Sequence, residues 1–267
     1  MRCLAVLFAL LAFAAPAAAV DVDLQLVLAV DVSRSMDTDE QQLQRDGYVA
    51  AFRHQSVIDA ITSGPVGRIA VMYLEWAGPG YQTVLSPWTV IAGPRDANAF
   101  ADLLAEAPLS RETGTSISSG LTLAADQFAA GGFRSERRAI DVSGDGPNNA
   151  GSPVDHARDS VVGRGITING LPILLKTDAG YGTFNIPDLA KYYEDCVIGG
   201  PGSFMVSVRD ASQFEAAIRR KLILEIAGLE PRIIPAAEVV ADPPMDCMIG
   251  EKLRWNSPYY RPYLNGR

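Results

Sequence analysis

The sequence predicts a doubly wound α/β fold, with a mostly parallel sheet, helices on both faces and one antiparallel edge strand. Strand-like apolar runs alternate with helical patterns over most of the 267 residues, and such alternation is typical of a parallel sheet covered on both sides. The runs at 24–30, 68–76 and 166–175 are almost continuously apolar. This continuity indicates strands that are buried on both faces.

The first strand, 24–30, leads into a helix that we expect to run to about residue 54. Asp37-Thr38-Asp39-Glu40 is a favourable helix start, because side-chain oxygens cap free backbone N–H groups and carboxylates favour the positive helix end. Strands 68–76 and 81–91 are separated by only a few residues, too few for a parallel crossover. They should therefore pair antiparallel, and Pro87 suits an edge strand.

The rest of the domain continues the alternation of helices and strands. We expect helices at 97–106, 116–130, 154–162, 186–195 and 211–226, and strands at 138–143, 166–175 and 204–208. Residues 20–228 should form this one domain. From 229 to 267 the sequence is rich in proline and aromatic residues without a clear period, which predicts an irregular tail packed on the domain.

The first 19 residues have the pattern of a signal peptide. Arg2 precedes an apolar stretch that ends in Ala17-Ala18-Ala19, a small-residue cleavage signal. The alternative, a membrane anchor, is disfavoured because a spanning helix needs roughly 20 apolar residues. We therefore expect an exported protein, periplasmic or secreted, with no membrane span in the mature chain.

Charge and cysteine content fit this location. The net charge of −8 makes nucleic acid or an anionic membrane a poor partner. Cys196 and Cys247 remain after removal of the signal peptide, and an even pair in an oxidising compartment favours a disulfide over two buried thiols. Closing this loop would stabilise the fold by roughly 4 kcal/mol in the loop-entropy model.

Three polar segments should meet at the carboxyl edge of the sheet, where ligands bind in such folds. Asp31, Ser33 and Ser35 follow the first strand, Thr115 precedes a helix, and Asp145 follows the strand at 138–143. Hydroxyls and carboxylates are hard oxygen ligands that suit Mg²⁺, Mn²⁺ or Ca²⁺. Mg²⁺ keeps several waters, which carboxylates can hold in an outer shell.

These segments resemble the metal-ion-dependent adhesion site of von Willebrand factor A (vWA) domains. That site comprises an Asp-x-Ser-x-Ser loop, a Thr before a later helix, and an Asp-Gly after the next strand. The resemblance implies direct ligation of a divalent cation, Mg²⁺ above all, by Ser33, Ser35 and Thr115, with Asp31 and Asp145 acting mainly through water. It also implies a further position that a carboxylate of a protein partner fills.

Within that superfamily, the closer resemblance is to an exported bacterial family of unknown function. It lies in the stretches EWAGPGYQTVLSPWTVI, AIDVSGDGPNN, ITINGLPI and YYEDCVIGGPGSF. This closer resemblance implies no particular role.

Several of these residues have a simpler structural interpretation. The Asp31 loop and Thr115 could serve only as helix caps, Asp145-Gly146 could form a tight turn, and Thr113 competes with Thr115. Asn148 and Asn149 are interpreted as turn formers. Asp141, a carboxylate inside a strand, needs a partner because a lone buried charge is costly, and an Arg or backbone amides are the expected partners.

The expected function is that of a cation-dependent binding module rather than an enzyme. The alternative is a metal-dependent hydrolase or phosphotransferase that uses the same site. Against it, the two histidines lie in helical patterns, and no nucleophile elbow, phosphate-binding loop or dinucleotide motif occurs. A third reading, a scaffold with a decayed site, is disfavoured by the complete set of five residues. The oligomeric state is left open.

Overall fold

The fold is taken from a computed structural model that describes residues 19–176, 186–228 and 243–257. The predicted signal peptide lies almost wholly outside the described residues, as do 229–242 and 258–267 of the predicted tail. Within the described part of the chain, no helix is both long and apolar enough for a membrane span.

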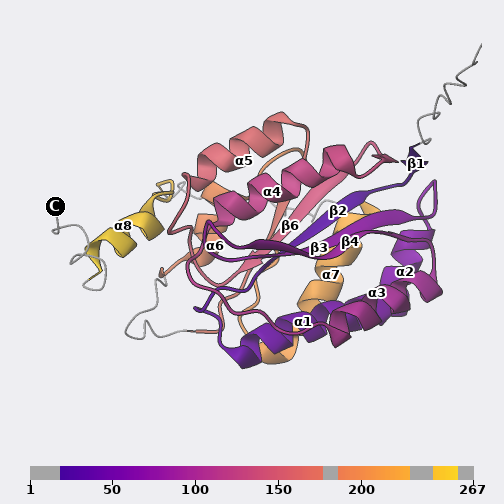
Figure 1. The fold of residues 1–267 in the computed structure, drawn as a ribbon, viewed down its shortest axis with the longest axis horizontal. Coiled ribbons are helices and arrows are strands. Elements are labelled where there is room, and N and C mark those ends of the chain that lie inside the picture. Colours follow the sequence, from indigo (N-terminus) through magenta and orange to yellow (C-terminus); the bar gives the residue numbers. More distant parts are fainter. Residues whose placement is uncertain (1–18, 177–185, 229–242, 258–267) are drawn as a thin grey trace, which may run out of the picture.

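A five-stranded sheet forms the centre of the molecule (Figure 1). Its strand order is β4–β3–β2–β6–β7, and the strands are β2 (Gln25–Asp31), β3 (Ile69–Trp76), β4 (Gln82–Ile91), β6 (Arg138–Gly144) and β7 (Thr167–Pro172). Neighbouring strands are parallel except the β3–β4 pair, which is antiparallel. The predicted fold class and its antiparallel edge strand are confirmed.

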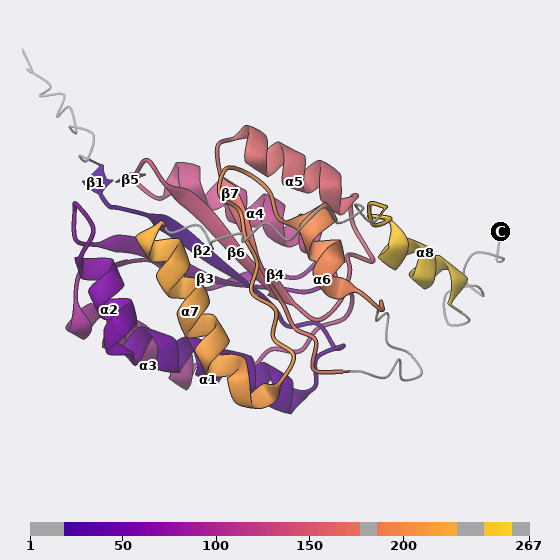
Figure 2. The same ribbon diagram turned by 180° about the vertical axis from the view of Figure 1, so that it is seen from behind.

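Helices cover both faces of this sheet (Figures 1 and 2). One layer holds α1 (Thr38–Arg53), α2 (Gln55–Thr62), α3 (Pro94–Glu106) and α7 (Phe214–Ala227), and the other holds α4 (Ile117–Ala130), α5 (Val154–Gly163) and α6 (Leu189–Tyr192). The side chains of β2 alternate between the two cores: Leu26 and Leu28 pack in the first, Val27 and Ala29 in the second. This double burial explains the continuous apolar run at 24–30.

Helix α1 begins as its sequence predicts. The carboxylate of Asp37 accepts a hydrogen bond from the Glu40 N–H, and the Glu40 carboxylate accepts one from the Asp37 N–H, both at 2.9 Å. This capping box satisfies two backbone donors that the helix leaves free. The separate helix α2 was not predicted, and it begins where the His54 ring accepts a hydrogen bond from the Ser56 N–H.

Three predicted elements differ from the structure. The segment 204–208 runs parallel to β7 through isolated bridges at Met205 and Val208 rather than as a regular strand. Its residues Phe204 and Val208 are buried, so the segment has the apolar pattern of a strand without the regular pairing. The helix predicted at 186–195 is short: α6 continues into a π-helical turn, Tyr193–Val197. Within the tail, which was predicted to be irregular, helix α8 (Ile249–Asn256) forms beyond the sheet.

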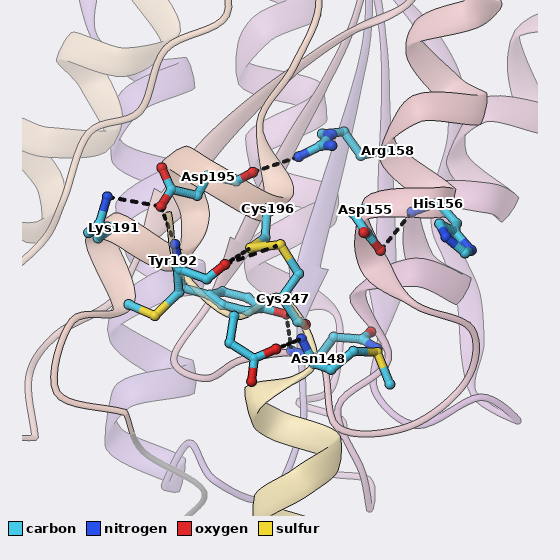
Figure 3. The surroundings of a disulfide bond; sticks show 12 residues. Asn148, Asp155, His156, Arg158, Lys191, Tyr192, Asp195, Cys196 and Cys247 are labelled. Carbon is cyan, nitrogen blue, oxygen red and sulfur yellow. Dashed lines mark hydrogen bonds and ion pairs between the residues drawn. A yellow bond between two sulfur atoms is a disulfide. The ribbon is translucent and has the colours of Figure 1, made fainter. Parts of the chain in front are cut away.

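Two smaller features complete the fold. Strands β1 (Val20–Asp21) and β5 (Phe133–Arg134) form a separate short parallel pair. Cys196 and Cys247 form the predicted disulfide, which joins the π-helical turn to the segment before α8 (Figure 3). The bond therefore ties the C-terminal segment to the body of the domain.

Asp141 has a buried partner, though not one of the kinds predicted. The Lys221 Nζ of α7 lies 2.6 Å from Asp141 Oδ1 and also contacts the Glu225 carboxylate. Lys221 is fully buried, and both acids are nearly so. Burial raises the pKa of Asp141, whereas the Lys221 charge opposes that rise. Burial and the nearby Asp141 charge raise the pKa of Glu225 to about 7.

Lys221→Met should lower the free energy of unfolding by about 3–5 kcal/mol, because it leaves two buried carboxylates without their cation. Urea unfolding followed by circular dichroism measures the loss. Lys252→Met is the control, since Lys252 and its partner Asp246 are both about half exposed and such a pair contributes at most about 1 kcal/mol. Equal losses in the two variants would contradict the importance of the buried cluster.

Candidate functional site

The loop after β2 gathers the first three candidate residues. Asp31 ends the strand, and its Oδ1 accepts a hydrogen bond of 2.7 Å from the Ser33 N–H. The hydroxyls of Ser33 and Ser35 share a hydrogen bond of 2.8 Å. Asp31 and Ser33 are buried, and Ser35 is half-buried. The alternation of residues therefore turns both serine hydroxyls toward the same point.

Asp145 reaches this loop from the neighbouring strand. It follows β6, which pairs in parallel with β2, and its Oδ1 accepts a hydrogen bond of 2.5 Å from the Ser35 hydroxyl. Gly144 allows the close approach, because a Cβ there would lie 2.9 Å from Asp31 Oδ2 and 2.9 Å from the Tyr193 hydroxyl. The two polar strand ends meet at the carboxyl edge, as the sequence predicts.

Thr115 is tied to both of these loops. Three residues before it, Glu112 exchanges backbone hydrogen bonds with the β2 loop, donating to Val32 and accepting from Arg34. On the other side, the Thr115 carbonyl accepts hydrogen bonds from the N–H groups of Asn149 and Ala150. The three segments that the sequence singles out are therefore held together at one edge of the sheet.

The carboxylates of the site are buried and incompletely satisfied. Asp31 Oδ2 and Asp145 Oδ2 are inaccessible to solvent and have no hydrogen-bond partner among the described residues. Burial raises the pKa of Asp31 well above its usual range, and the charge on Asp145 raises it further. Burial likewise raises the pKa of Asp145 to about 6, against the lowering effect of Ser35 and Lys176. Such carboxylates favour a bound cation or ordered water.

The donor chemistry fits a hard divalent cation. Within the described ranges, His, Cys, Asp and Glu form no cluster of three or more that could hold a metal. A cation at this edge would therefore depend on the hydroxyls of Ser33, Ser35 and Thr115 together with the two aspartates. Oxygen sets of this kind suit Mg²⁺, Mn²⁺ or Ca²⁺.

Lys176 is a charged neighbour that the sequence did not reveal. Its ammonium group donates hydrogen bonds to the Ser35 carbonyl and the Glu40 carboxylate, and lies 3.9 Å from Asp145 Oδ2. A cavity of about 30 Å³ lies against Glu40, Asp145 and Lys176, which is room for about one water. No motif marks a lysine after the last strand, and only the pairing of β7 with β6 brings it here.

Asn148 and Asn149 are more than turn formers. Both are buried, and the Asn149 Oδ1 accepts a hydrogen bond of 3.1 Å from the Thr115 N–H. The Asn148 Oδ1 accepts one of 3.1 Å from the Ser118 N–H, in the first turn of α4. The two amides therefore hold the segment that carries Thr115.

Stability in chelator should depend on the titration of Asp145. Its pKa is about 6 in the folded chain and near 3.8 when unfolded. Between these values the folded state binds the proton more tightly, so the free energy of unfolding decreases as the pH rises from about 4 to about 6.

Asp145→Asn removes this dependence. From pH 4 to pH 7 the variant should gain on the order of 2 kcal/mol relative to wild type, at 1.36 kcal/mol per pKa unit. Urea unfolding at both pH values measures the difference. The contribution of Glu225 is present in both proteins and cancels. That of Asp31 does not, because the Asp145 charge raises its pKa, and its reduction in the variant adds to the gain. A constant difference between them would contradict the raised pKa.

Solved structures with the same fold come from several sources. The chain is similar to proximal thread matrix protein 1 (PTMP1) of the mussel byssus with a zinc-occupied MIDAS motif, with a TM-score of 0.57 and 15% identity over 78% of this chain and 49% of that one. It is similar to the pilus adhesin SpaC of Lactobacillus rhamnosus GG in its open conformation, with a TM-score of 0.55 and 15% identity over 77% of this chain and 30% of that one. It is also similar to a von Willebrand factor type A protein of Catenulispora acidiphila, with a TM-score of 0.53 and 16% identity over 77% of this chain and 43% of that one.

These similarities show the fold, and the chain spans less than half of each of these three structures. No curated protein matches the chain. A family model described as "Protein of unknown function (DUF1194)" matches residues 21–230, which is most of the chain. The chain therefore belongs to the DUF1194 family, and its fold is that of a vWA domain.

Proposed function

We propose that this protein is an exported binding module that uses a divalent cation to hold a protein partner. The observation that carries the proposal is the convergence of Ser33, Ser35, Thr115 and two buried aspartates at one sheet edge. Each aspartate keeps an oxygen that has no hydrogen-bond partner within the described ranges. A bound cation would supply a local positive charge on an otherwise acidic protein.

Each candidate residue has a role in this proposal. The hydroxyls of Ser33, Ser35 and Thr115 bind Mg²⁺ directly, and the carboxylates of Asp31 and Asp145 hold its waters. Such an arrangement suits Mg²⁺, which is bound by few protein ligands and retains several waters. A carboxylate of the partner then takes a remaining position. Mn²⁺ and Ca²⁺ share the oxygen preference and are the alternative cations.

The structural neighbours support a binding role. PTMP1 is described with a zinc-occupied MIDAS motif, and SpaC is a pilus adhesin. The disulfide between Cys196 and Cys247 supports export, because such bonds persist in oxidising compartments. A hydrolase or phosphotransferase is the alternative, and Asp145 would then act as its base.

Ser33→Ala and Thr115→Ala should each weaken Mg²⁺ binding by at least about 100-fold, because direct ligands contribute more than the 10–100-fold of outer-shell partners. Isothermal titration calorimetry measures the affinity, and thermal unfolding in chelator should show both variants folded. Ser212→Ala, which changes an exposed serine before α7, should bind like wild type. Unchanged affinity in both site variants would refute the ligand assignment.

Partner binding should require both the cation and the intact site. Wild-type protein immobilised with Mg²⁺ should retain proteins from a periplasmic extract that chelator then releases, whereas Ser33→Ala should retain none of them. A peptide with an exposed carboxylate should compete, and its amidated form should not. Mg²⁺-dependent turnover of a hydrolase substrate that is lost in Asp145→Ala would favour the enzyme alternative instead.

A further inference from the structure

The disulfide places the start of helix α8 beside Asn148, in the loop that follows β6 (Figure 3). Cys247 lies just before the helix, and Cys196 lies in the π-helical turn after α6. Two hydrogen bonds reinforce the covalent bond: the Met245 N–H donates to Asp195 Oδ2 at 2.7 Å, and the Tyr192 hydroxyl donates to the Cys247 carbonyl at 3.4 Å. Helix α8 is therefore anchored to the domain by the residues just before it.

From this anchor, α8 contacts the loop that follows β6. The Glu251 Oε1 accepts a hydrogen bond of 2.6 Å from the Asn148 Nδ2, and the Arg254 Nη1 donates one of 3.3 Å to the Asn149 carbonyl. The helix lies so close that a Cβ on Gly250 would be 2.0 Å from the Asn148 carbonyl oxygen. Only glycine fits at that position, so the close packing of α8 on Asn148 depends on Gly250.

The two asparagines that α8 contacts also hold Thr115. On their inner side, Asn149 exchanges hydrogen bonds with the backbone of Thr115, and Asn148 caps the first turn of α4 at Ser118. Asn148 and Asn149 thus lie between α8 and the segment with the proposed hydroxyl ligand. A shift of α8 would therefore act, through these two asparagines, on the backbone that carries that hydroxyl.

Glu251 makes this contact at an energetic cost. It is 4% exposed, and its second oxygen, Oε2, is buried without a hydrogen-bond partner among the described residues. A buried carboxylate lowers stability unless it is well paired. In return, the charged acceptor makes a stronger bond to the Asn148 amide than a neutral group would. The arrangement favours a fixed position for Asn148 over maximal stability.

We propose that α8, held by the Cys196–Cys247 bond, is a positioning element of the cation site, and that Glu251 fixes the loop on which Thr115 rests. This inference depends on the proposed function, because it concerns the affinity of the same site. Mg²⁺ requires nearly ideal octahedral geometry with short ligand distances. A small displacement of the Thr115 hydroxyl therefore weakens binding even though the fold survives.

Mg²⁺ titration of the full mature chain tests this proposal with paired variants. Glu251→Ala should weaken Mg²⁺ affinity by about 10–100-fold, as the loss of an outer-shell partner does. Glu251→Gln keeps an oxygen acceptor for Asn148 and should bind within about threefold of wild type. Lys252→Ala, the adjacent change on the same helix, should bind like wild type because its partner Asp246 lies at the surface.

The disulfide is tested separately. The double variant Cys196→Ser, Cys247→Ser should lose affinity as Glu251→Ala does, measured at a temperature where circular dichroism shows both proteins folded. Amide hydrogen exchange in chelator should be faster around Thr115 and Ser118 in both variants, and unchanged in Lys252→Ala. This second readout follows the loop itself and requires no bound cation.

The outcomes separate the two proposals. Wild-type affinity in Glu251→Ala and in the cysteine variant, beside a wild type that binds Mg²⁺, overturns the positioning role and leaves the proposed function standing. A wild type that does not bind Mg²⁺ overturns the proposed function and, with it, this inference. If Glu251→Ala does not fold, the cysteine variant decides: wild-type affinity and exchange there refute the role of α8.

Discussion

Two buried carboxylates at the edge of the sheet impose the main constraint on this molecule. Asp31 ends β2 and Asp145 directly follows the neighbouring parallel strand β6, and each keeps an oxygen without a hydrogen-bond partner in the described structure. Their mutual repulsion and burial are unfavourable in a protein without a cation. The hydroxyls of Ser33 and Ser35, the ammonium of Lys176 and the loop around Thr115 are all arranged around this charge.

A second cluster of buried carboxylates is paired within the protein itself. Asp141, Lys221 and Glu225 lie between the sheet and α7, and the lysine contacts both acids directly and balances one of their two charges. At the candidate site, the nearest lysine is 3.9 Å from Asp145 and is bonded to other oxygens. The same chain therefore places its own cation in direct contact with one carboxylate cluster, where Glu225 Oε2 also lacks a hydrogen-bond partner in the described structure, and leaves the other cluster suited to an external cation.

The sequence predicted most of the architecture because its signals are local. Double burial makes a strand apolar at every position, the short link after Trp76 allows only an antiparallel partner, and Asp37 with Glu40 marks a helix start. Other elements were missed where local signals fail. Helix α2 continues the pattern of α1, and the apolar segment near Met205 pairs only through bridges. Helix α8 is stabilised largely by tertiary contacts, which a sequence pattern does not contain.

The candidate site likewise combines residues that the sequence predicted with contacts that only the structure shows. The residue types and spacing of Asp31, Ser33, Ser35, Thr115 and Asp145 are local information, and together with parallel pairing they were enough to predict the meeting of three loops. The approach of Lys176 to Asp145 and the hydrogen bonds of Asn148 with Ser118 and Glu251 depend on which distant segments become neighbours. The sequence by itself determined the fold class, the oxygen-rich edge and the cysteine pair. Only the tertiary structure decided which groups surround that edge, because burial and hydrogen bonding arise between residues far apart in the chain.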